Sequence, residues 1–156
     1  MARIDALIAD MTLAEKIGQL VMVTAGEVIT GPVSAADPRA GVKTGRIGSL
    51  LNLWGTEATR AMQRVAVEES RLGIPVFFGF DVIHGHRTIF PVPLGEAAAF
   101  DPDLWEATAR TAAEEAAADG VDLTFAPMLD VCRDPRWGRI VEGPGEDTLV
   151  ARRMAE

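Results

Sequence analysis

The stretch Ile74-Pro-Val-Phe-Phe-Gly-Phe80, with Asp81-Val-Ile-His-Gly-His-Arg87 directly after it, decides how this chain folds. The first part is apolar along its length, which is typical of a parallel β-strand covered on both faces. The second part is polar and begins with a carboxylate where the strand ends. In α/β proteins, the residues of active and binding sites lie mainly in the loops at the carboxyl ends of the strands.

The same alternation of strand and helix extends outward on both sides. Further strands are predicted at Leu20–Val23, Ile47–Leu53 and Leu123–Ala126, and loops at Gly26–Gly45, Asp81–Leu94 and Pro127–Asp147. Helices are predicted from the capping box Thr12-Leu-Ala-Glu15 to about Gln19, over Thr56–Leu72 with Gly73 as its stop, from Asp101-Pro102 to near Gly120, and from Thr148 onward. This order predicts an α/β fold with a parallel sheet, either a (β/α)8 barrel or an open doubly wound sheet. A complete barrel needs roughly 250 residues, so these 156 residues can supply about half of one.

Charge and composition narrow the classes of function. The formal net charge is −8, and a surface of that sign repels nucleic acid and anionic membranes. No apolar run is long enough to span a bilayer, and Met1-Ala-Arg-Ile-Asp5 lacks the pattern of a signal peptide. The single cysteine, Cys132, excludes an intrachain disulfide and fits a reducing compartment. We therefore expect a cytoplasmic protein without nucleic-acid or membrane partners, although a removed signal peptide would leave the same pattern.

The loop after Phe80 carries the first candidate site residues. The carboxylate of Asp81 can accept hydrogen bonds from two neighbouring hydroxyls, the pattern that a sugar presents, and Arg87 can pair with it or donate to another hydroxyl. The alternative is that Asp81 only caps a turn. For His84 and His86 we expect hydrogen bonds to loop carbonyls. A metal site is disfavoured because the chain has no third His and only one Cys, so we predict no metal and no cofactor.

The loop at residues 130–147 is the second candidate. It holds Arg133, Arg136 and Arg139 among five carboxylates, and such a cluster is usually a network of ion pairs that stiffens the loop. A stiff loop can still direct one guanidinium into a site, where its fork suits adjacent hydroxyls. Glycosidases need two carboxyl groups that flank the bond, and composition marks none of these. From the residues alone, the prediction stops at a site for a sugar or another polar ligand.

At these loops the chain resembles glycoside hydrolase family 3. The matching segments occur in the family's order and cover nearly the whole chain: Met11-Thr-Leu-Ala-Glu-Lys-Ile-Gly-Gln-Leu20, Ile47-Gly-Ser-Leu-Leu-Asn52, Gly73-Ile-Pro-Val76, Asp81-Val-Ile-His-Gly-His-Arg-Thr-Ile-Phe-Pro91, Ala126-Pro-Met-Leu-Asp-Val131, Asp134-Pro-Arg-Trp-Gly-Arg139 and Glu142-Gly-Pro-Gly-Glu-Asp147. The resemblance implies that residues 1–156 are the N-terminal half of a (β/α)8 TIM-barrel-like domain. It also implies retaining hydrolysis of β-glycosides from the non-reducing end.

The resemblance also implies roles for particular residues. Asp81, Arg87 and Arg139 match positions that bind the sugar in the subsite of the cleaved unit, with Arg136 the second choice for the role of Arg139. Glu142, Glu146 and Asp147 match positions that we interpret as structural. The family's Lys-His pair and its Ser-Asp-Trp-like nucleophile segment do not occur in the chain. No catalytic residue is therefore assigned, and the chain alone is expected to be inactive.

The function expected from this resemblance is that of a β-glucosidase which releases β-D-glucose from a β-glucoside or a short β-gluco-oligosaccharide. Glucose is preferred over xylose. The alternative is a non-catalytic sugar-binding or assembly module built from a half barrel. In either case we expect the open sheet to need a partner, which is the rest of the barrel or a second copy of the chain.

Overall fold

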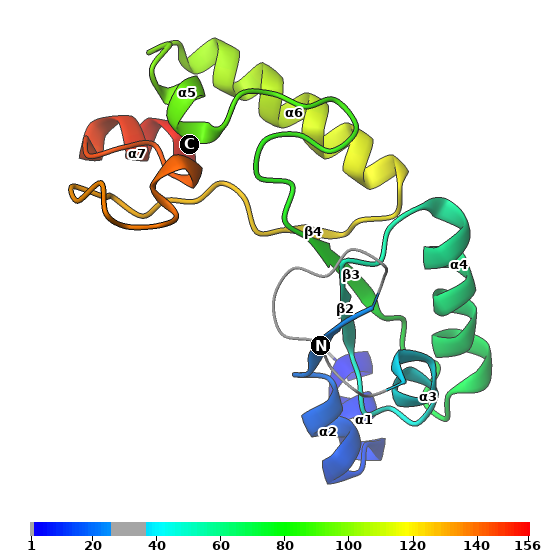
Figure 1. The fold of residues 1–156 in the computed structure, drawn as a ribbon. Coiled ribbons are helices and arrows are strands. Elements are labelled where there is room, and N and C mark those ends of the chain that lie inside the picture. The colour runs from blue at the N-terminus through cyan, green and yellow to red at the C-terminus, as the bar shows by residue number, and fades with distance from the viewer. Residues whose placement is uncertain (1, 26–36) are drawn as a thin grey trace. The chain divides into compact units, whose positions relative to one another are not determined.

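The computed structural model describes residues 2–25 and 37–156 and contains a parallel β-sheet (Figure 1). Its strands are β1 (Met22–Thr24), β2 (Ser49–Leu51), β3 (Phe77–Phe80) and β4 (Leu123–Thr124). They lie in the order β1-β2-β3-β4, and both β1–β2 and β2–β3 pair in parallel. A doubly wound sheet reverses its strand order at a switch point, whereas a barrel adds strands in sequence. The prediction of an α/β, TIM-barrel-like fold is confirmed, with shorter strands than expected.

Two compact units make up the chain. The first comprises the residues up to Phe80 together with Asp119–Leu123, and the second comprises Asp81–Ala118 with Thr124–Glu156. The core of the first unit contains Leu50, Val65 and Phe78, all at most 2% exposed. Phe77 on β3, by contrast, is 42% exposed. The expectation that this strand is covered on both faces is wrong for the described chain, because a barrel interior is filled by side chains from all of its strands.

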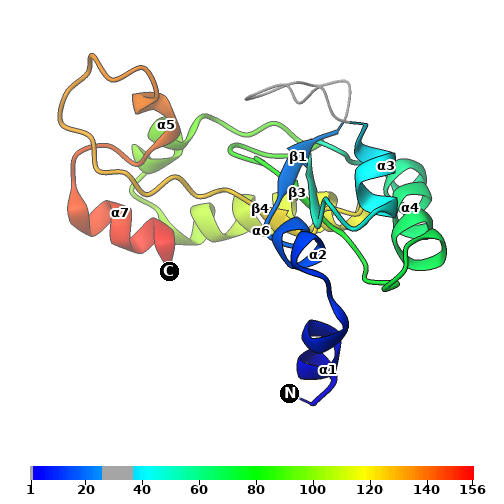
Figure 2. The ribbon, with the colours of Figure 1, turned by 90° about the horizontal axis from the view of Figure 1, so that it is seen from below.

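The helices of the first unit are α1 (Ala2–Asp10), α2 (Leu13–Gly18), α3 (Pro38–Lys43) and α4 (Thr56–Arg64), which continues as the π-helical turn η1 (Val65–Glu69). Helices α3 and α4 lie side by side next to the strands (Figures 1 and 2). Helix α3 corrects the loop predicted at Gly26–Gly45, of which residues 26–36 lie outside the described part. Pro38 stands in its first turn, where proline is favoured, and Asp37 accepts the N–H of Arg39 at 2.9 Å as its N-cap. The sequence analysis assigned no element at α1.

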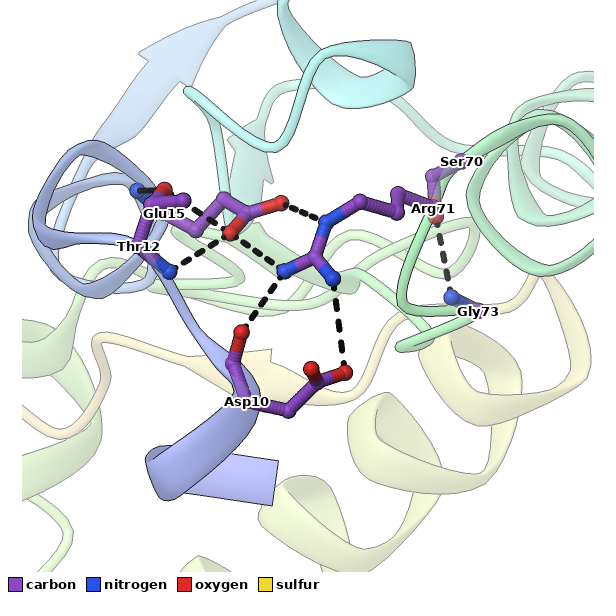
Figure 3. Close-up of polar contacts among 6 residues, drawn as sticks. All are labelled: Asp10, Thr12, Glu15, Ser70, Arg71 and Gly73. Atoms are coloured by element: carbon purple, nitrogen blue, oxygen red, sulfur yellow. Dashed lines mark hydrogen bonds and ion pairs between the residues drawn. The ribbon is translucent and has the colours of Figure 1, made fainter.

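The capping box at the start of α2 is confirmed and is part of a larger network (Figure 3). The amide of Glu15 donates to the Thr12 hydroxyl at 3.3 Å, and Glu15 Oε2 accepts the amide of Thr12 at 2.8 Å. Arg71, which follows η1, donates to both carboxylate oxygens of Glu15 at 2.9 and 2.7 Å and to the carbonyl of Asp10 at 2.9 Å. One guanidinium therefore joins the two N-terminal helices to the segment that leads into β3.

The second unit contains α5 (Pro93–Ala97), α6 (Pro102–Ala118), the 3-10 turn η2 (Ile140–Glu142) and α7 (Thr148–Ala155). The helices predicted from Asp101-Pro102 and from Thr148 begin as expected: Asp101 Oδ1 accepts the amide of Asp103 at 3.1 Å, and Asp147 Oδ1 accepts that of Leu149 at 2.7 Å. Helix α5 contacts η2, and α6 contacts α7. Within the described residues, no helix has the length and apolar character needed to cross a membrane.

Hydrogen bonds hold the beginning of β4 to β3, the strand that precedes the first candidate loop. In the first unit, Asp122 donates its amide to the carbonyl of Phe78 at 2.9 Å and accepts the Phe78 amide on Oδ2 at 3.0 Å. The start of β4 is thus held beside β3. The loop with Asp81 follows β3, and the loop with Arg139 follows β4.

Candidate functional site

Asp81 lies where β3 ends, as the first residue of the second unit. Its carbonyl accepts the hydroxyl of Thr124 at 2.9 Å. The next residue, the buried Val82, has a φ of 47°, a left-handed conformation that is unusual for a β-branched side chain. Strained backbone of this kind occurs preferentially at functional sites, and the sequence carries no signal for it.

The loop beyond Asp81 closes on itself. The amide of Phe90 donates to the carbonyl of His84 at 2.8 Å, and Nδ1 of His84 lies 3.2 Å from the carbonyl of Phe90. Gly85 makes the turn with a φ of 109°, and a Cβ there would lie 1.9 Å from the carbonyl oxygen of Thr88. The prediction that His84 bonds to a loop carbonyl is confirmed, and residues 84–90 form one compact turn.

Arg87 is exposed, and its backbone is anchored to α6. The carboxylate of Glu115 accepts the amides of Arg87 and Thr88 at 2.8 and 2.7 Å, and the hydroxyl of Thr88 at 2.6 Å. The hydrogen bonds from Thr88 are the main cause that lowers the pKa of Glu115. The sequence analysis missed Glu115, because it lies 27 positions beyond Thr88 and resembles any surface acid of an Ala/Glu-rich helix.

Ion pairs stiffen the second loop, as predicted. Arg136 donates to both carboxylate oxygens of Asp134, with Nε at 2.9 and 3.1 Å, and its side chain is 89% exposed. Arg139 pairs with Glu142, with Nε 2.8 Å from Oε2. The two limbs of the loop run side by side, since the amide of Cys132 donates to the carbonyl of Gly145 at 3.2 Å.

Arg139 shares an electrostatic environment with Asp81. The hydrogen bonds to Glu142 are the main cause that raises the pKa of Arg139, and the charges of Glu142, Asp130 and Asp81 add to it. All four residues belong to the second unit. The charge of Asp81 therefore reaches Arg139, whereas the third predicted site residue, Arg87, is held through its backbone.

The arrangement favours a neutral, hydroxyl-rich ligand over an anion. A guanidinium and carboxylates side by side offer donors and acceptors at once, and the negative charges around Arg139 offset its attraction for an anion. Arg136 is bound to its own neighbour and directed to solvent, so it is the weaker candidate for the role of Arg139. Among the described residues, no group of three or more His, Cys, Asp or Glu is placed to hold a metal ion.

Comparisons with known proteins identify the family of the chain. The model of the glycosyl hydrolase family 3 N-terminal domain matches residues 12–156. The chain is 45% identical over 156 residues to the periplasmic β-glucosidase of Salmonella typhimurium, covering 97% of this chain and 20% of that protein. It is 36% identical over 158 residues to β-D-xylosidase 1 of Arabidopsis thaliana, covering 98% of this chain and 17% of that protein.

Solved structures of β-glucosidases are also similar to this chain. The β-glucosidase of Listeria innocua in complex with isofagomine has a TM-score of 0.88 and 37% identity, and its complex with glucose has a TM-score of 0.84 and 32% identity; each comparison covers 99% of this chain and 22% of that protein. The chain spans about a fifth of the length of these relatives. With nearly all of its residues matched by the family model, the chain belongs to glycosyl hydrolase family 3, within the N-terminal domain.

Proposed function

We propose that this chain supplies the sugar-binding part of a β-glucosidase-type glycosidase that acts from the non-reducing end with retention. The observation that supports the proposal is that Asp81 and Arg139 lie in loops that follow the neighbouring strands β3 and β4, and that both residues belong to one unit. Residues 1–156 are then one part of an N-terminal barrel domain. The remaining strands of the barrel, or a second copy of the chain, are its partner.

Each site residue has a distinct role in this proposal. Asp81 accepts hydrogen bonds from two adjacent hydroxyls of the sugar, and Arg139, held by Glu142, donates to a further one. Arg87 contributes from the turn that Glu115 anchors. Such charge-assisted hydrogen bonds are roughly twice as strong as neutral ones, and they orient the ring before the bond is cleaved.

Glucose is the sugar that we propose for this subsite. The Salmonella relative is named a β-glucosidase and the Listeria enzyme has been solved with glucose, while the Arabidopsis relative is named a xylosidase. The higher identity to the β-glucosidase of Salmonella supports a β-glucoside or a short β-gluco-oligosaccharide as the substrate. A cytoplasmic location is proposed from the single cysteine, whereas the Salmonella relative is named periplasmic.

The covalent step is not assigned to this chain. A retaining glycosidase needs two carboxyl groups about 5–5.5 Å apart around the bond, and Asp81 is proposed to bind hydroxyls instead. The nucleophile and the acid/base residue are therefore proposed to lie outside these 156 residues.

The test is kinetic and uses the full-length protein with aryl β-glucoside and aryl β-xyloside substrates. We expect Asp81→Ala and Arg139→Ala each to lower kcat/KM for the glucoside. The expected loss of transition-state stabilisation is about 2–5 kcal/mol, because each change removes a charged partner of the substrate. The matched control is Arg136→Ala in the same loop, which should stay within about twofold of wild type because its partner is Asp134.

Three results would contradict the proposal. Equal losses in Arg136→Ala and Arg139→Ala would show a general loop effect rather than a sugar contact. A preference of the wild type for the xyloside would overturn the choice of glucose. A wild type that binds glucose without turnover would favour the non-catalytic half-barrel module.

A further inference from the structure

The carboxylate of Glu115 accepts three hydrogen bonds from a distant turn, whereas an acid on a helix surface can be satisfied by water alone. It lies on α6 and is half-buried, and its carboxylate accepts two consecutive backbone amides and one hydroxyl, all from Arg87 and Thr88. The neighbouring Glu114 on the same helix is exposed. Two adjacent amides that converge on one carboxylate determine the orientation of the peptide plane between them, because both N–H vectors must point at the same group.

The hydrogen bonds to Glu115 hold the whole turn at residues 84–90 in place. Residues 84–90 are closed by the reciprocal hydrogen bonds of His84 and Phe90 and by the tight conformation at Gly85. Holding Arg87 and Thr88 therefore holds the turn against α6, within a single unit of the structure. The Cα–Cβ direction of Arg87 follows from its backbone, so the same contacts limit where its guanidinium can reach.

We propose that Glu115 is a positioning residue of the sugar site, which presents Arg87 to the ligand by anchoring the Arg87–Thr88 turn without touching the sugar itself. This inference rests on the proposed function, because it needs a sugar bound beside the turn. Its physical basis is preorganisation: a turn already held in the bound conformation loses less entropy when the ligand arrives.

The experiment measures binding and stability separately in the full-length protein. Glu115→Gln keeps the size of the side chain but removes the charge and one of the two acceptor oxygens. We expect KM for an aryl β-glucoside and the inhibition constant of free glucose to rise about tenfold, as for the loss of one charge-assisted hydrogen bond, with kcat close to wild type. Tm should fall as well, because the charged carboxylate also stabilises the fold. The matched control is Glu114→Gln, which should change none of these values.

A milder variant tests the same contact from the other side. Thr88→Val removes only the hydroxyl that donates to Glu115, and we expect it to raise the inhibition constant of glucose by about threefold. In the double variant with Glu115→Gln, the effects should not add, because both changes break one interaction.

The outcomes separate the two hypotheses. If wild-type protein neither hydrolyses a β-glucoside nor binds glucose, the proposed function itself fails. If the wild type is active and both variants lower only Tm, with KM and the inhibition constant unchanged, Glu115 is merely structural and the inference is overturned. Additive effects in the double variant would also overturn it.

Discussion

Glu142 is the residue that holds Arg139 in place. It accepts hydrogen bonds from two nitrogens of the guanidinium, and it is the first cause of the raised pKa of Arg139. The charges of Asp130 and Asp81 add to this rise in the pKa of Arg139. Glu142 therefore orients the guanidinium of Arg139.

At the scale of this residue, we predict that Glu142→Gln weakens the binding of glucose without removing it. The neutral amide of the Gln side chain forms weaker hydrogen bonds with the guanidinium than the carboxylate of Glu142 does. Arg139 therefore keeps its charge but loses its fixed orientation. KM for an aryl β-glucoside should rise about three- to tenfold, as measured by steady-state kinetics. Asp134→Asn, which breaks the exposed ion pair with Arg136, is the control and should have no effect. A similar rise in KM in both variants would contradict the prediction.

At the scale of the element, the carboxylate of Glu15 both caps helix α2 and forms an ion pair with Arg71. Glu15 closes the capping box of its own helix and also binds Arg71, which comes from a distant segment (Figure 3). The hydrogen bonds from Arg71, followed by those from Thr12, lower the pKa of Glu15 from its usual 4.5 to about 2. The charged form is thus the one that the folded state prefers.

This preference predicts a pH dependence of stability. A carboxyl whose pKa is lower in the folded state stabilises the fold fully above its ordinary pKa, and the contribution disappears as the pH falls from about 4.5 to about 2. We expect Tm of the wild type to fall across this window by more than Tm of Glu15→Gln does. Calorimetry at pH 7, 4 and 2.5 measures the difference. Parallel curves for the two proteins would show that Glu15 does not contribute in this way.

At the scale of the whole molecule, the described chain leaves apolar surface uncovered. Phe77 on β3, Leu123 on β4 and Phe125 just beyond it are all more than a third exposed. Parallel strands are normally buried on both faces. These side chains need further chain to cover them, which agrees with a segment that spans about a fifth of the length of its relatives.

We predict that the 156 residues by themselves show no measurable hydrolysis of an aryl β-glucoside. The proposed nucleophile and acid/base lie elsewhere, and a retaining mechanism has no covalent step without the nucleophile. The full-length protein under the same conditions is the positive control. Turnover by the 156-residue chain that disappears in its Asp81→Ala variant would refute the prediction and place catalysis within this segment.

The sequence by itself determined the features that depend on near neighbours. The capping box joins residues three positions apart, and the N-cap of α7 joins residues two positions apart. The alternation of strands and helices follows from local composition in the same way. The family motifs also indicated Asp81 and Arg139 without any knowledge of their positions in space.

Only the tertiary structure decided which distant residues meet. The strand order separated a barrel from a doubly wound sheet. The bonds from Arg71 to Glu15 cross 56 positions, and those from Thr88 to Glu115 cross 27. The segment that contains α3 was predicted as a loop from its Gly, Pro and Ala content, because composition does not show when an N-cap and a neighbouring helix will stabilise a short helix. The physical reason is common to these cases: such contacts form only after the chain between them has closed, and a pattern of near neighbours carries no information about that closure.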